Sequence, residues 1–140
     1  MEKSVIRVWI AGAGYLGVPL AQQLQAAAYS VCASSRTPRE GVVWQAWDFA
    51  AHSALQDFQA ANTWVVLLPP SSGNDYVAHM RHLCAQAQQL QLAHVVYASS
   101  TSVYGSEARV CDETSSVAPE SDHAKQIVRS EQIWQNSGLP

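Results

Sequence analysis

Three glycines with the spacing G-x-G-x-x-G follow a short apolar run near the N-terminus. The run spans Val5–Ala11, and the glycines are Gly12, Gly14 and Gly17. Between a strand and a helix, such glycines permit a tight turn, a close approach of backbone to a pyrophosphate, and close packing of helix on strand. The positive end of the helix then faces the phosphates. The spacing therefore predicts a dinucleotide site, with an unoccupied strand–helix turn as the alternative.

The residues after the expected second strand indicate which dinucleotide would bind. NAD sites usually carry an acidic residue about 20 positions after the glycines. This sequence has Ser34, Ser35 and Arg36 there, and no carboxylate before Glu40. Hydroxyls and a guanidinium suit a 2′-phosphate, with which arginine forms forked, charge-assisted hydrogen bonds. The predicted cofactor is NADP, with NAD as the alternative. The alternative interpretation of Arg36 is a solvated loop residue with no role in binding.

Hydroxyl residues also follow the apolar segment 94–98. Ser99, Ser100, Thr101 and Ser102 lead into Val103-Tyr104-Gly105. Ligands of open α/β sheets bind beyond the carboxyl ends of the strands. A serine hydroxyl at this position can therefore hydrogen-bond to the oxygen of a small-molecule substrate.

This Ser-Ser-Thr-Ser-Val-Tyr-Gly segment resembles the extended branch of the short-chain dehydrogenase/reductase superfamily, the NAD(P)-dependent epimerases and dehydratases. Gly14-Tyr15-Leu16-Gly17 is similar to the G-Y-[IL]-G of that family, and Asp48 matches its adenine-contacting aspartate. The resemblance implies that Ser100 orients a substrate hydroxyl, while Ser99 and Tyr104 support the pocket. The predicted cofactor-binding residues are Gly12, Gly14, Tyr15, Leu16, Gly17, Ser34, Ser35, Arg36, Asp48, Leu68, Pro69 and Ser99.

The chain departs from this family where the catalytic tyrosine is expected. The family places it in Y-x-x-x-K at the start of the next helix, but residues 119–127 contain no tyrosine. One register puts Ser121 and Lys125 at this spacing, and another puts His123 and Ile127 there. The candidate catalytic residues are therefore Ser100, Lys125 and His123. Histidine suits acid–base work near neutral pH, and a solvated polar residue at a helix start is the alternative for His123.

Two smaller departures make the chain resemble an atypical member of the family. Ala11 stands where the extended branch has the first glycine of G-x-x-G-x-x-G. Residues 68–72, Leu-Pro-Pro-Ser-Ser, replace the small residues usual after the fourth strand.

Strand and helix patterns alternate along the chain, which predicts a parallel sheet. We expect strands at 5–11, 29–33, 42–47, 63–68 and 94–98, and a short helical turn at 52–59. We expect one helix after the glycines, with Leu16, Leu20 and Leu24 on one face. A second helix is capped by Ser72 or Asn74 and carries an apolar stripe of Tyr76, Met80, Leu83, Ala87 and Leu90. A third helix turns Ala124, Ile127, Val128 and Trp134 to the inside. The predicted fold is α/β: a Rossmann-like, doubly wound parallel sheet of about five strands, with helices on both faces.

Composition narrows the class of protein. The 140 residues suit one NAD(P)-binding domain, 1–140. A sixth strand is expected after the last helix, so the sequence reads as a fragment that lacks later strands and a substrate lobe. The net charge of −3 argues against nucleic acid and anionic membranes as partners. No membrane span and no signal-peptide pattern is present. Three widely spaced cysteines indicate reduced thiols in the cytoplasm and no metal site.

Two functions from different classes remain open. The first is the NAD(P)-binding domain of an oxidoreductase- or epimerase-like enzyme that transfers hydride to or from a hydroxyl- or carbonyl-bearing, sugar-like substrate. The second is a non-catalytic NAD(P)-binding module that senses redox state or acts as a scaffold, which the missing tyrosine favours. A third hypothesis is a domain that binds nothing tightly, whose open fifth strand pairs with another copy as a homodimer.

Overall fold

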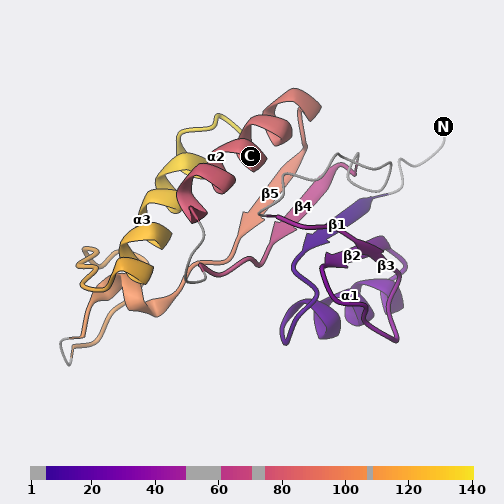
Figure 1. Cartoon of the computed structure of the whole chain (residues 1–140), viewed down its shortest axis with the longest axis horizontal. Helices are drawn as coiled ribbons and strands as arrows, with labels where there is room; N and C mark the ends of the chain where they lie inside the picture. Colours follow the sequence, from indigo (N-terminus) through magenta and orange to yellow (C-terminus); the bar gives the residue numbers. More distant parts are fainter. Residues whose placement is uncertain (1–5, 50–60, 71–74, 107–108) are drawn as a thin grey trace.

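A five-stranded parallel sheet forms the centre of the molecule (Figure 1). A computed structural model describes residues 6–49, 61–70, 75–106 and 109–140. The strands are β1 (Arg7–Ala11), β2 (Ser30–Ser35), β3 (Trp44–Ala46), β4 (Thr63–Val66) and β5 (His94–Tyr97). Their order is β3-β2-β1-β4-β5 and every neighbouring pair is parallel. From β1 the strand order runs outward to β2 and β3 on one side and to β4 and β5 on the other, so the carboxyl ends of β1 and β4 flank a topological switch point.

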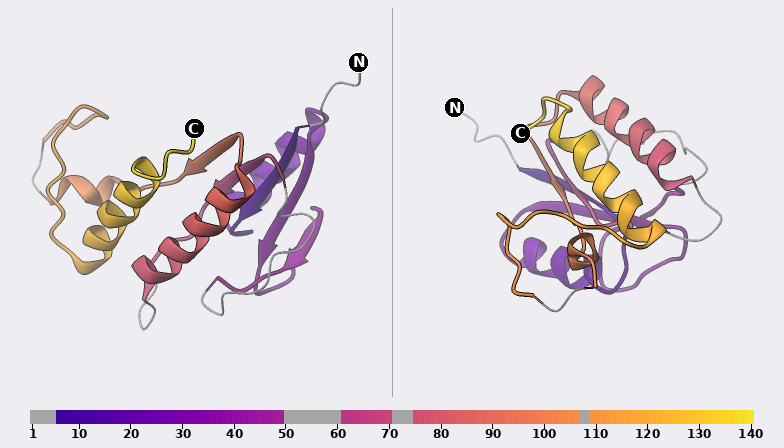
Figure 2. Two further views of the ribbon diagram at one scale, coloured as in Figure 1. Left: turned by 90° about the horizontal axis from the view of Figure 1, so that it is seen from above. Right: turned by 90° about the vertical axis from the view of Figure 1, so that its left-hand side faces the viewer.

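Helices cover both faces of this sheet, which confirms the predicted doubly wound class (Figure 2). Helix α1 (Gly17–Ala26) packs over β1 and β2, while α2 (Tyr76–Leu90) and α3 (Asp122–Gln135) lie side by side on the opposite face. A short 3₁₀ helix, η2 (Thr101–Tyr104), follows β5. Alternate residues of β1 serve the two layers, with Val8 and Ile10 facing α1 and Trp9 facing the other side.

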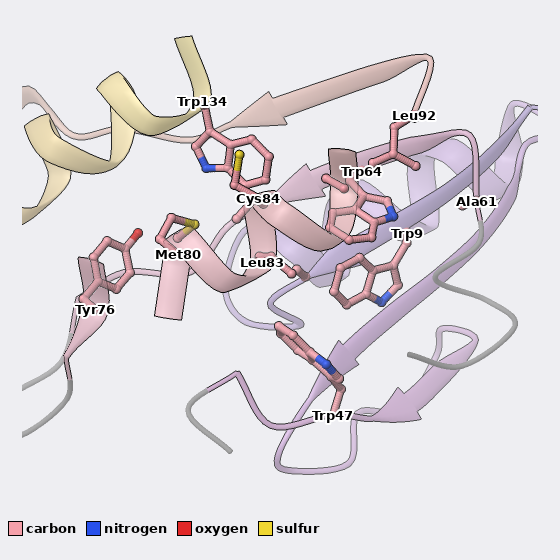
Figure 3. Packing of buried hydrophobic residues seen from close by; sticks show 13 residues of the cluster. Trp9, Trp47, Ala61, Trp64, Tyr76, Met80, Leu83, Cys84, Leu92 and Trp134 are labelled. Atoms are coloured by element: carbon pink, nitrogen blue, oxygen red, sulfur yellow. The ribbon is translucent and has the colours of Figure 1, made fainter. Parts of the chain in front are cut away.

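Tryptophans dominate the core between the sheet and α2 (Figure 3). The Trp9 ring meets those of Trp47 and Trp64 edge-on, at centroid distances of 4.9 Å in both pairs. Leu83 packs into the same cluster from α2. The Trp9 indole N–H donates to the Ser34 hydroxyl at 2.9 Å, which satisfies a polar group inside the core. Burial of these rings joins β1, β4 and the segment just after β3 to α2.

The end of the second strand, the cap of α2 and the burial of two leucines differ from the expectations. Strand β2 runs to Ser35 instead of stopping at Ala33, because Ser34 and Ser35 pair with β3. Asp75 caps α2 by accepting a hydrogen bond from the Ala78 N–H at 3.2 Å; Ser72, Asn74 and the helical turn expected at 52–59 lie outside the described residues. Leu16 precedes α1 and is exposed, and Leu90 at the end of α2 is exposed as well.

The outer edge of the sheet is formed by β5. Among the described residues no sixth strand pairs with it, but the Val95 N–H donates to the Pro140 carbonyl at 2.9 Å. Gln88 of α2 holds the preceding turn through a hydrogen bond from its Nε2 to the Ser137 carbonyl. Residues 137–140 therefore lie against part of this edge.

The Trp9–Ser34 hydrogen bond gives a stability prediction. Ser34→Ala removes the acceptor of the buried indole N–H, and we expect the free energy of unfolding to fall by about 1–3 kcal/mol. Ser30→Ala, at the exposed start of the same strand, should change it by less than about 0.5 kcal/mol. Urea denaturation of both variants measures the difference; equal values would show that the bond contributes nothing.

Candidate functional site

The glycine turn is held by contacts that only glycine permits. Gly12 has φ +118°, and a Cβ there would lie 2.8 Å from the Leu67 carbonyl oxygen. At Gly17 a Cβ would lie 2.0 Å from the Gly12 carbonyl oxygen. The N–H groups of Gly12 and Ala13 both donate to the Ser34 carbonyl, at 3.0 and 2.9 Å. The start of α1 is therefore pressed against the ends of β1 and β2.

Gly14 differs from the other two glycines. A Cβ at Gly14 would meet no atom of the described residues within 4 Å. The fold therefore does not require glycine here, and its absent side chain leaves open space beside the turn. This space suits a ligand whose atoms approach the backbone closely, as a pyrophosphate does.

A cavity of about 330 Å³ opens beside the turn, at the carboxyl ends of β1, β2 and β4. It brings together eight of the predicted cofactor-binding residues: Gly12, Gly14, Ser34, Ser35, Arg36, Asp48, Leu68 and Pro69. Its other lining residues are Ala13, Arg39, Trp47, Phe49 and Leu67. Residues separated by more than fifty positions thus share one site, as the switch point of a doubly wound sheet requires.

The two predicted serines are engaged within the protein. The Ser34 hydroxyl is fully buried and accepts the Trp9 N–H. The Ser35 hydroxyl accepts the Trp44 indole N–H at 2.8 Å and donates to the Thr37 carbonyl at 2.6 Å. Arg36 is exposed at the cavity. At the end of β2 the cavity is therefore lined by the positive charge of Arg36 more than by free hydroxyl groups.

A second cavity of about 280 Å³ lies next to the first and shares Leu67, Leu68 and Pro69 with it. The remaining lining residues are Leu16, Pro70, Tyr76, Tyr97, Ala98, Ser99, Ser100, His123 and Ile127. Ser100 is the N-cap of η2, and its hydroxyl oxygen accepts the Ser102 N–H at 3.2 Å. That bond fixes the oxygen and leaves the hydroxyl proton available to a ligand.

The second cavity distinguishes the two alternatives for the Y-x-x-x-K positions on α3. His123 and Ile127, one turn apart on α3, both line it, whereas Ser121 and Lys125 do not. The Ser121 hydroxyl instead caps α3 by accepting the Ala124 N–H at 3.0 Å. Of the candidate catalytic residues, Ser100 and His123 therefore line the same cavity, and Lys125 does not line it.

Some predicted residues lie outside both cavities or turn away from them. Tyr15 is fully exposed, Gly17 is buried beneath the turn, and neither lines a cavity. The Ser99 hydroxyl donates to the Glu131 carboxylate of α3. Tyr104 donates to the Asp112 carbonyl at 2.8 Å, so it supports the loop after η2 and does not line the second cavity.

Two phenols line the second cavity, the buried Tyr76 and the partly buried Tyr97. The Tyr76 hydroxyl donates to the Leu68 carbonyl at 2.5 Å and lies 2.8 Å from the Tyr97 hydroxyl, which therefore donates to it. Burial raises the pKa of Tyr76 above its ordinary value, and burial likewise raises the pKa of Tyr97. Both phenols stay protonated at neutral pH and do not act as bases, which leaves the His123 imidazole as the acid–base candidate among the described lining residues.

Sequence reasoning missed Arg39, Trp47 and Phe49 in the first cavity and the two phenols in the second. The Arg39 Nε–H donates to the Ala13 carbonyl at 2.6 Å, which brings the loop between β2 and β3 onto the glycine turn. Its only sequence signal was a cation a few residues beyond Arg36. No pattern in the sequence marked the aromatic residues as cavity lining, and Trp47 also packs in the core.

Comparisons with solved structures find the same fold. The MoeE5 complex with UDP-glucuronic acid and NAD has a TM-score of 0.75 at 25% identity, over 91% of this chain and 48% of that one. TunA, an NAD-dependent NDP-hexosamine 5,6-dehydratase, has a TM-score of 0.77 at 24% identity, over 96% and 51%. UDP-N-acetylglucosamine 4-epimerase from Bacillus cereus has a TM-score of 0.78 at 17% identity, over 96% and 52%. No protein-family model and no curated protein matched the sequence.

The strand order and the helices on both faces define a Rossmann-like domain, and the first cavity lies at its topological switch point. Within that class, these structures confirm the resemblance to the NAD-dependent epimerases and dehydratases of the extended short-chain dehydrogenase/reductase branch. The chain spans about half the length of each of them.

Among the described residues, none of the helices is both long enough and apolar enough to cross a bilayer. The described residues contain no cluster of three or more histidine, cysteine, aspartate or glutamate side chains suited to a metal ion; the expectation that the protein uses no metal stays a prediction.

The glycine contacts give a second stability prediction. In Gly17→Ala the methyl group would overlap the Gly12 carbonyl, and we expect the free energy of unfolding to fall by at least about 3 kcal/mol. Gly14→Ala adds a methyl group to open space and should change it by less than about 1 kcal/mol. Thermal or urea unfolding distinguishes them; a stable Gly17→Ala protein would contradict the packing described.

Proposed function

We propose that this chain is a nicotinamide dinucleotide-binding domain of an oxidoreductase- or epimerase-like protein. The observation that carries the proposal is the open space at Gly14, inside a cavity at the carboxyl ends of β1, β2 and β4. MoeE5 and TunA, which share this fold, are described with NAD. The adjoining cavity with Ser100 and His123 gives a substrate a place beside the cofactor.

The preferred cofactor in this proposal is NADP. The described residues that line the first cavity include Arg36, Arg39 and one carboxylate, Asp48. No acidic residue at the end of β2 is present to accept a hydrogen bond from a ribose 2′-hydroxyl. Because the Ser34 and Ser35 hydroxyls bind tryptophans, the preference rests on the guanidinium of Arg36, which suits a 2′-phosphate.

In the enzyme version of this function, the bound nicotinamide supplies or accepts a hydride. Ser100 donates its hydroxyl proton in a hydrogen bond to the substrate oxygen and so orients it. The imidazolium of His123 gives a proton to that oxygen when a carbonyl is reduced to a hydroxyl, and neutral His123 takes it back in the reverse direction. A hydroxyl- or carbonyl-bearing sugar fits a site whose polar groups are hydroxyls and an imidazole. The structural relatives act on or bind nucleotide-linked sugars.

A non-catalytic sensing or scaffolding module is the second candidate. The observation that favours it is that, among the described residues, the tyrosines lining the second cavity are the buried Tyr76 and the partly buried Tyr97, whose raised pKa values suit structural hydrogen bonds. Cytoplasmic location and a homodimer formed through the β5 edge stay predictions in either version.

Cofactor preference is tested by fluorescence. Trp47 lines the first cavity, so bound NADPH or NADH should quench tryptophan emission by energy transfer. We expect NADPH to bind at least about tenfold more tightly than NADH, and Arg36→Gln to remove that difference. Gly14→Ala should weaken both by about tenfold or more, because its methyl group fills the space for the ligand. Equal affinities that Arg36→Gln leaves unchanged would refute the NADP preference; no quenching by either at millimolar concentration would refute the proposed function.

Catalysis is tested by NADPH oxidation with a panel of 4-keto sugar nucleotides. If the domain is catalytic, Ser100→Ala and His123→Gln should each lower the turnover rate by about 100-fold or more, with Lys125→Gln as the matched control that leaves it unchanged. Full activity of His123→Gln would exclude the histidine, and cofactor binding without turnover would favour the sensing module.

A further inference from the structure

Arg39 is placed at the glycine turn and not with Arg36 at the strand end. Its Nε–H donates to the carbonyl of Ala13, the residue between Gly12 and Gly14. The loop that carries it turns back toward α1 at Gly41, which has φ +77° and lies against the Gln22 side chain. These two contacts fix the guanidinium on the side of the cavity where the backbone leaves open space.

The remaining donors of Arg39 are available. Both of its Nη groups make no hydrogen bond with any residue that the structure describes. Arginine carries five N–H donors in a fixed planar fork, so four remain when Nε–H binds Ala13. A guanidinium with its stem held and its fork unengaged is preorganised for a phosphate oxygen pair.

The backbone donors that an anion could use lie in the turn, ahead of the first helical hydrogen bond. That bond runs from the Val18 N–H to the Gly14 carbonyl at 3.2 Å, and Leu16 provides no side-chain cap. The N–H groups of residues 14–17 bond to no other described backbone group. An anion at this turn would therefore meet these N–H groups, and Arg39 stands beside them with four donors of its own.

We propose that Arg39 binds the pyrophosphate common to NAD and NADP, while Arg36 alone recognises the 2′-phosphate. This inference rests on the proposed function and divides its charged wall into two subsites. Arg39 then governs affinity for any dinucleotide, and Arg36 governs the choice between the two.

Four ligands distinguish the two subsites. NADH and ADP-ribose carry the pyrophosphate without a 2′-phosphate, adenosine 2′-monophosphate carries the 2′-phosphate without the pyrophosphate, and NADPH carries both. Isothermal titration of the full chain with each ligand should show that Arg39→Gln weakens NADH, ADP-ribose and NADPH by about tenfold each. The same variant should leave adenosine 2′-monophosphate unchanged. Arg36→Gln should weaken only NADPH and adenosine 2′-monophosphate.

Controls separate binding from folding. Arg81→Gln, an exposed arginine on α2, should change none of the affinities. Arg39→Lys keeps the charge but loses the fork, so it should bind the pyrophosphate ligands with intermediate affinity, while a thermal melt shows whether each variant is folded. Loss of NADPH affinity alone in folded Arg39→Gln, or no loss at all, would overturn the division of roles. Failure of the unmutated chain to bind NADH and NADPH would instead overturn the proposed function.

Discussion

The contact between Gly17 and the Gly12 carbonyl is the constraint on which the site depends. Because a Cβ at Gly17 would lie 2.0 Å from that oxygen, α1 can begin directly over the end of β1 only with glycine there. The same turn is held to β2 through the Ser34 carbonyl and to the segment after β4 through Leu67. Since β1 lies between these two strands, one turn sets the position of three strand ends and the cavity among them.

The local part of this arrangement could be predicted from the sequence. A strand that ends in spaced glycines and leads into a helix is a short-range pattern, and alternating strands and helices restrict the sheet to a parallel, doubly wound form. The glycines were placed in the site by that pattern, Arg36 by its position after the second strand, and Asp48 and Ser100 by the resemblance to a known family. The structure brings Arg36 and Asp48 into the first cavity and Ser100 into the second.

The long-range part could not be predicted. Nothing near Ser34 in the sequence shows that a tryptophan twenty-five residues away takes its hydroxyl, or that Arg39 folds back onto Ala13. The choice between Lys125 and His123 was also undecided, because it depends on which face of α3 meets β5. Packing of α3 settles the geometry by turning His123 and Ile127 to the cavity. Tertiary contacts of this kind leave no periodic signal in the chain.

The most direct test of a dinucleotide at this turn is a map of backbone amide chemical shifts on addition of NADPH. The account predicts that the largest changes fall on Gly12, Ala13 and Gly14, with smaller changes at Arg36 and Ser100. Changes concentrated at the outer edge of β5, around Val95 and Pro140, would contradict it, because they would place the ligand in a different part of the molecule.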